Sequence, residues 1–147
     1  MVHSDEIDLP TSLGYLLKEA ATALRVAMED ALRPLDLTVT AYSCLEILAQ
    51  RPGSSNSDLA RGAFVTRQSM NVLLQTLERE GLVTRPTTAV EGRVLPVTLT
   101  DAGQRRREQA SAVVKGVEDR MLAELSAPER AQAFDVLTRM TRALREG

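Results

Sequence analysis

The chain has 147 residues, 44% of them apolar and 3% aromatic, with no tryptophan, so its core must be built mainly from leucine, alanine, valine and methionine. This length predicts one domain. No apolar run approaches the roughly 20 residues that span a membrane, and no signal-peptide pattern opens the chain, so we expect a cytoplasmic protein. Cys44 and His3 are the only cysteine and histidine, which excludes an internal disulfide and a Cys/His metal site within one subunit.

The formal net charge of −2 is distributed unevenly along the chain. Residues 51–107 contain nine arginines and five acidic residues, whereas residues 1–50 contain three basic and eight acidic residues. A basic segment is expected where a protein contacts phosphate, although a swing of this size also arises by chance.

The first predicted element is a long helix that follows a loose arm at residues 1–10. Apolar residues recur at helical spacing from Leu13 to Leu35, and Thr11 or Ser12 can cap the start. Pro34 requires the helix to end or kink just before it. The apolar stripe is longer than a small domain can bury, which favours contact with a partner.

Two shorter helices are predicted next. Thr38 or Thr40 can cap a helix that runs to about Gln50. Ser55 and Asp58 have capping-box spacing and predict a short helix that breaks at Gly62.

A fourth helix is predicted over 66–80, with Thr66 as its cap and Gly81 as its left-handed C-terminal residue. At about 100° per residue, one face is apolar and is predicted to enter the core: Met70, Leu73, Leu74 and Leu77. The opposite face carries mainly uncharged polar residues: Gln68, Asn71, Val72, Gln75 and Arg79.

This outward face suits base recognition in a DNA major groove. Gln and Asn can pair bidentately with adenine, and an exposed Val72 can contact the thymine methyl. Arg67 flanks the face, and Thr66 and Ser69 lie where a helix N-terminus attracts phosphate. Capping is the favoured role for Thr66, and the alternative for the whole face is an ordinary solvated surface.

Two strands, 82–85 and 95–99, are predicted to form a hairpin after this helix, with Pro96 on an exposed edge. The tip at 87–94 contains Gly92 and Arg93. Arg93 could enter a minor groove, or it could be a solvated loop arginine. Helix, turn, helix and hairpin together are typical of a winged DNA-binding module.

Two further helices complete the chain, one capped by Thr100 and one starting at a capping box from Ser126 to Glu129. They and the first helix carry more apolar surface than the winged module needs, which favours pairing across a two-fold axis over an intramolecular bundle. The run Arg105–Arg107 is interpreted as a solvated face, with phosphate contact as the alternative.

Several segments together resemble the MarR family of transcriptional regulators. The matching segments are Leu59-Ala60, Val65-Thr66, Leu77–Arg85, Glu91-Gly92-Arg93 and Val97–Gly103. The resemblance implies a mainly α-helical, winged helix-turn-helix homodimer, with dimerisation helices at 1–35 and 101–147 and a DNA-binding module at 38–100. It also implies repression at a pseudo-palindromic site on double-stranded DNA, with recognition helices roughly 34–36 Å apart. Glu91 replaces the aspartate usual in the wing motif of the family.

Members of this family commonly bind small aromatic or phenolic acids between the dimer region and the winged module. Tyr15 and Tyr42 are candidates to line such a site, although core packing is the favoured role for each taken singly. A structural role for Cys44 is favoured over redox sensing. A winged protein-interaction module without DNA binding remains a further alternative. Neither an enzyme nor a cofactor is predicted, because no catalytic pair or phosphate loop is evident.

Overall fold

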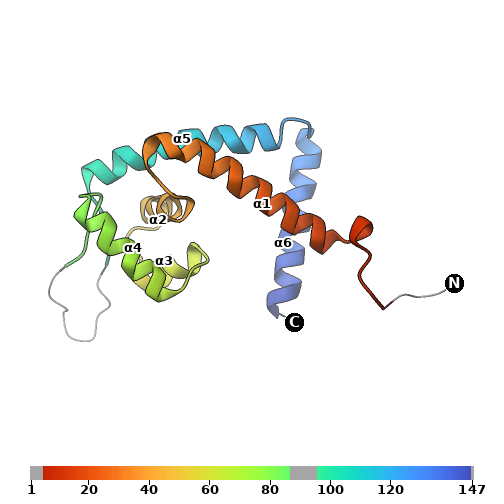
Figure 1. Ribbon diagram of the computed structural model, residues 1–147, viewed down its shortest axis with the longest axis horizontal. Helices are drawn as coiled ribbons and strands as arrows, with labels where there is room; N and C mark the ends of the chain where they lie inside the picture. The colour runs from red at the N-terminus through yellow and green to blue at the C-terminus, as the bar shows by residue number, and fades with distance from the viewer. Residues whose placement is uncertain (1–4, 87–95, 147) are drawn as a thin grey trace.

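The computed structural model describes residues 5–86 and 96–146, and these residues are mainly helical (Figure 1). The helices in chain order are α1 (Leu13–Leu32), α2 (Val39–Gln50), α3 (Asn56–Gly62), α4 (Arg67–Arg79), α5 (Asp101–Met121) and α6 (Ala127–Glu146). Short 3-10 turns occupy Leu9–Thr11 and Arg33–Leu35, and the strands are β1 (Val83–Thr84) and β2 (Thr98–Leu99). The predicted fold class, helices with one small hairpin, is confirmed.

Helix starts are fixed by side chains that accept a hydrogen bond from a backbone N–H three residues ahead. The capping hydroxyls of α1, α2, α4 and α5 lie 3.0–3.1 Å from those nitrogens and belong to Ser12, Thr38, Thr66 and Thr100. Capping boxes start α3 at Ser55 and α6 at Ser126. Each cap contributes about 1 kcal/mol to helix stability.

Helix ends also follow local chemistry. Helix α1 ends at Leu32, because Pro34 lies in the following 3-10 turn. Gly81 follows α4 with φ +75°, the left-handed conformation that glycine adopts without strain. Gly62 is the last residue of α3, and a Cβ there would lie 2.7 Å from Cδ1 of Ile47. Glycine therefore allows close packing of α3 on α2.

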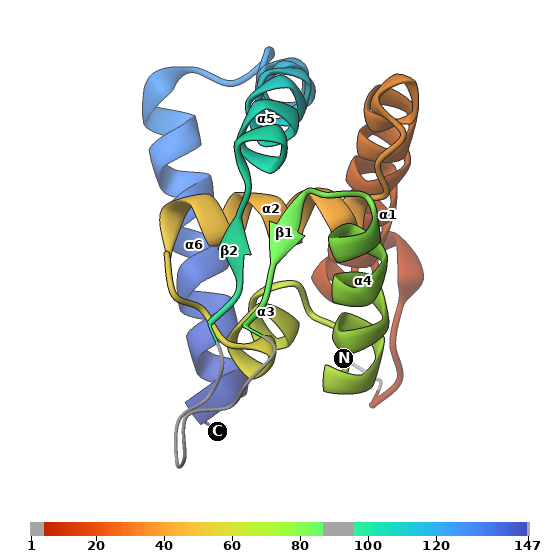
Figure 2. The ribbon, with the colours of Figure 1, turned by 90° about the vertical axis from the view of Figure 1, so that its left-hand side faces the viewer.

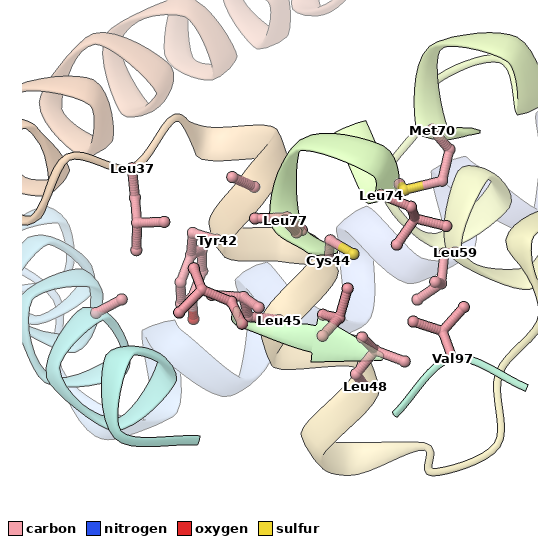
Figure 3. Packing of buried hydrophobic residues seen from close by; sticks show 14 of the residues in the cluster. Leu37, Tyr42, Cys44, Leu45, Leu48, Leu59, Met70, Leu74, Leu77 and Val97 are labelled. Carbon is pink, nitrogen blue, oxygen red and sulfur yellow. The ribbon is translucent and has the colours of Figure 1, made fainter. Parts of the chain in front are cut away.

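The core lies in the winged module, between α2, α3, α4 and the two strands (Figure 3). Leu45, Leu59 and Leu74 are fully buried there. The predicted inner face of α4 is confirmed, since Met70, Leu74 and Leu77 are buried and Leu73 packs against the same cluster. Apolar residues at helical spacing thus determine which face of α4 packs against the core.

The β1–β2 hairpin is shorter than predicted. Antiparallel pairing joins Val83 to Leu99 and Thr84 to Thr98. Beyond this, the N–H of Val97 donates to the carbonyl of Ser54, at 3.3 Å, in the loop after α2. The chain thus leaves the β1 ladder to bond to a different segment, which shortens the regular pairing.

Helix α5 connects the winged module to the outer helices. It packs against α1 and α2, while α6 turns away from its far end (Figure 1). At its start, the Thr100 hydroxyl donates to the Gly81 carbonyl at 2.6 Å, and the Thr100 N–H donates to the Leu82 carbonyl at 3.1 Å. The orientation of α5 is therefore fixed directly by the end of α4.

Candidate nucleic-acid interface

Helix α4 lies on the outside of the winged module beside the hairpin (Figure 2), and most of its polar residues are exposed. Gln68, Gln75 and Arg79 are exposed, and Val72 is 57% exposed although it is apolar. No apolar contact of the core is lost if this face meets a ligand, because the opposite face carries the packing. The exposed polar face predicted from the sequence is therefore present, and its contact with DNA stays a prediction.

The N-terminal end of α4 is capped by Thr66. Its hydroxyl oxygen accepts from the Ser69 N–H at 3.0 Å, and the hydroxyl donates to the Ser69 Oγ at 3.0 Å. The amide of Asn56, in α3, donates to the Arg67 carbonyl at 3.3 Å and ties the two helices together. Capping is thus the structural role of Thr66, and phosphate contacts by Thr66, Arg67 and Ser69 remain predictions.

Asn71 differs from the other residues of the predicted reading face, because it is half-buried and already bonded. Its Oδ1 accepts from Nη1 of Arg85 at 2.9 Å, and Nε of Arg85 donates to Oε1 of Glu78 at 2.6 Å. Asn71 lies about 60° around the helix from Gln68, toward the hairpin. The expectation that Asn71 lies fully on the outward, exposed face is therefore corrected. Arg85 was not among the predicted site residues. Side chains alternate between the two sides of an extended chain, so Arg85 lies on the same side as Val83, toward α4.

The predicted wing residues Glu91, Gly92 and Arg93 lie outside the described residues. The insertion of Arg93 into a minor groove stays a prediction from the sequence. Thr84 and Thr98 mark where the described part of the hairpin ends its pairing.

The arginine run at the start of α5 is not uniformly solvated. Nη1 of Arg106 donates to the Leu35 carbonyl at 2.9 Å, and Nη1 of Arg107 lies 3.4 Å from Oε2 of Glu46. The interpretation of the run as a solvated face is thus wrong for these two residues and agrees with the structure only for Arg105, which is exposed. Arg106 and Arg107 fasten α5 to the α1–α2 region.

The two tyrosines proposed for a ligand site are not brought together. Tyr42 lies in the core, where its hydroxyl donates to Oε1 of Glu46 at 2.9 Å, and burial raises its pKa to about 12. Tyr15 is 50% exposed near the start of α1, the end of that helix farthest from α2 (Figure 1). Core packing therefore accounts for Tyr42, and a ligand contact by either tyrosine stays a prediction.

A cavity of about 700 Å³ lies instead between the C-terminal half of α1, the start of α2 and the α3–α4 turn. Arg25 and Arg33 line it on one side, and Leu37, Val65 and Phe64 line it elsewhere. Phe64 is 83% exposed, with φ +61°. No sequence motif marked this cavity, because its walls come from three separate elements.

A larger cavity of about 840 Å³, with Arg51, Arg61 and Arg145 in its lining, opens beside the α2–α3 loop.

Cys44 is completely buried, and burial raises the pKa of its thiol to about 12. A thiol sensor needs an accessible thiolate, so this environment supports the structural interpretation of Cys44. Among the residues that the structure describes, no cluster of three potential metal ligands occurs, and no helix is long and apolar enough to cross a membrane.

Comparison with known proteins identifies the family. Residues 35–94 match a family model described as MarR family. The HTH-type transcriptional repressor Rv2887 of Mycobacterium tuberculosis is 43% identical over 128 residues, which cover 87% of this chain and 92% of the repressor. The chain belongs to the MarR family. It is thus a winged helix-turn-helix transcriptional regulator, as the sequence predicts.

Solved structures of this MarR-family relative agree with the assignment. Rv2887 in complex with salicylic acid is 41% identical, with a TM-score of 0.72, over 92% of this chain and 98% of that chain. Rv2887 in complex with DNA is 40% identical, with a TM-score of 0.74, over 88% of this chain and 98% of that chain. The MarR fold therefore extends over nearly the whole chain, including the outer helices.

Proposed function

We propose that this MarR-family protein is a repressor that binds a pseudo-palindromic double-stranded DNA site as a homodimer and is released by a small aromatic or phenolic acid. The observation that carries the proposal is the exposed polar face of α4, held by a buried apolar face in a helix-turn-helix. The complex of Rv2887 with DNA supports it. A regulator of this kind needs no catalytic group and acts in the cytoplasm, where it meets DNA.

The residues of α4 divide by role in this proposal. Gln68, Val72 and Gln75 face base edges, since their side chains project from the exposed side of the helix. Arg67 and Ser69 contact phosphate near the helix N-terminus. Contacts with base edges determine the sequence preference, and contacts with phosphate contribute affinity and fix the position of the protein along the duplex.

The outer helices supply the dimer contact, so residues 1–35 and 101–147 form the dimerisation region and residues 38–100 the DNA-binding module. Large apolar side chains are exposed on α1 and α6, including Leu13 (69%), Phe134 (76%) and Leu144 (86%). Helix α6 makes no extensive contact with another element among the described residues. Apolar surface of this extent is covered in a stable protein, and a second copy provides a matching surface by symmetry.

The effector site in this proposal is the 700 Å³ cavity between α1, α2 and the α3–α4 turn. Arg25 can pair with a carboxylate here, whereas Arg33 is already bonded to Asp30 at 3.0 Å and Glu29 and Asp36 also line the cavity. Phe64, with Leu37 and Val65, can contact an aromatic ring. The complex of Rv2887 with salicylic acid supports this class of ligand. A ligand here changes how the outer helices sit on the winged module, and release follows when the bound geometry misfits DNA.

One DNA-binding assay tests the proposal. Selection from random duplexes identifies a preferred site, and its affinity is then measured from low to physiological salt. Gln68→Ala and Gln75→Ala should each weaken binding to the preferred site by about 1–3 kcal/mol and change random-DNA binding much less. Gln109→Ala, at an exposed position of α5, is the control and should have no effect.

The same assay tests effector release. Salicylate should weaken binding by the wild type, and Arg25→Ala should need a higher salicylate concentration than wild type, with Lys18→Ala on the same helix as the control. Binding without any sequence preference or salt dependence would refute the repressor proposal. An unchanged salicylate response in Arg25→Ala would refute only the effector site.

A further inference from the structure

Arg85 forms a bridge between the hairpin and the reading helix. Its Nε donates to Oε1 of Glu78 at 2.6 Å, and its Nη1 donates to Oδ1 of Asn71 at 2.9 Å. Asn71 and Glu78 are seven residues apart and therefore lie on the same side of α4, two turns from each other. The guanidinium thus lies along one flank of the reading helix, with its side chain only 22% exposed.

This bridge decides the orientation of the Asn71 amide. A guanidinium has only donors, so the amide atom that faces Arg85 must be the oxygen, and the two ends of the amide cannot exchange while the bond is kept. The amide nitrogen, Nδ2, has no hydrogen-bond partner among the described residues. The group that Asn71 can offer away from Arg85 is therefore a donor.

The orientation matters for reading DNA. An asparagine that recognises adenine uses both amide atoms together, the oxygen accepting from N6 and the nitrogen donating to N7. An amide whose oxygen is held toward the hairpin cannot turn both atoms to one base. A donor alone selects major-groove acceptors, which are N7 and O6 of guanine, N7 of adenine and O4 of thymine.

We propose that Arg85 is a specificity-determining residue, which acts by holding Asn71 as a donor-only contact to the DNA base edge. The proposal rests on the DNA-binding function proposed above. It assigns Arg85 no contact with DNA, so its effect passes through Asn71. Glu78 completes the arrangement by fixing the other side of the guanidinium.

Site selection from random duplex DNA with wild type, Asn71→Ala and Arg85→Ala tests this arrangement. Asn71→Ala should lose preference at one position of each half-site, which identifies the base that Asn71 contacts. At that position the wild type should reject cytosine, and Arg85→Ala should shift the preference toward adenine by about tenfold, because the released amide can pair bidentately. Other positions should keep their wild-type preference.

Asn71→Asp provides a second test that keeps the side-chain shape and the Arg85 contact. It replaces the outward donor by an acceptor, so the preference at the same position should change to cytosine, whose N4 is a donor. An unchanged preference at that position in Arg85→Ala, with affinity lowered equally on all sequences, would show that Arg85 only braces the hairpin. If the wild type selects no site, the DNA-binding function itself fails, and this outcome is distinct from both.

Discussion

Gly103, in the first turn of α5, packs directly against the backbone of the winged module. A Cβ at this position would lie 2.0 Å from the carbonyl oxygen of Leu82 and 3.3 Å from Cδ2 of Leu99. The first of these distances is more than about 1 Å shorter than a normal carbon–oxygen contact. The Leu82 oxygen cannot simply move away, because it accepts the 3.1 Å hydrogen bond from Thr100 N–H.

Gly103→Ala should therefore destabilise the protein. Overpacking of this kind costs about 1–3 kcal/mol. Loss of the bond from Thr100 to Leu82 adds about 1 kcal/mol. The higher helix propensity of alanine returns at most about 1 kcal/mol. The free energy of unfolding should thus fall by about 1–4 kcal/mol, and for a chain of this size each kcal/mol lowers the Tm by about 2–4 °C.

Gly116→Ala on the same helix is the matched control. Gly116 is exposed, and a Cβ there meets nothing within 4 Å. The substitution should raise the free energy of unfolding by about 0.5–1 kcal/mol, because alanine favours the helix. Both variants are compared with wild type by urea denaturation at one protein concentration, since dimerisation makes stability depend on concentration. If Gly103→Ala is as stable as wild type, the close approach of α5 to Leu82 is not rigid and the reasoning fails.

Two further predictions concern the core and the outer helices. The pKa values of Cys44 and Tyr42 are raised to about 12 from 9.0 and 10.0, so stability is fully present below pH 9 and should fall as pH rises toward 12. Urea denaturation at pH 8 and 10.5 measures this fall in stability. Cys44→Ala should lose less stability than the wild type between these two pH values. A wild type that is equally stable at both would contradict the prediction. Deletion of residues 126–147 should give monomer or aggregate in sedimentation, whereas a well-folded dimer would show that α6 is not needed for pairing.

Local chemistry made much of the fold predictable. The caps at Ser55, Thr66 and Thr100 involve a side chain and a backbone N–H only three residues away, so the sequence contains all of the interaction. The apolar period of α4 similarly identified its buried face before any neighbour was known. Pro34 and Gly81 mark helix ends through their own backbone restrictions and freedoms.

Contacts between distant segments could not be predicted in the same way. Arg85 meets Asn71 across fourteen residues, and Arg106 meets Leu35 across seventy-one, so each pairing depends on how whole elements pack. The placement of Tyr42 in the core and the walls of the α1–α2 cavity likewise depend on several elements at once.

The sequence by itself determined where most helices begin, the helix ends near Pro34, Gly62 and Gly81, which face of α4 is buried, and the family resemblance that the comparisons confirmed. Tertiary structure alone decided that the Asn71 amide is held by Arg85, that Arg106 and Arg107 brace α5, and that Gly103 lies against Leu82. The physical reason is the distance along the sequence over which each interaction acts. Capping and helical periodicity act within a few residues, whereas the direction of a half-buried polar side chain depends on partners that only folding brings near.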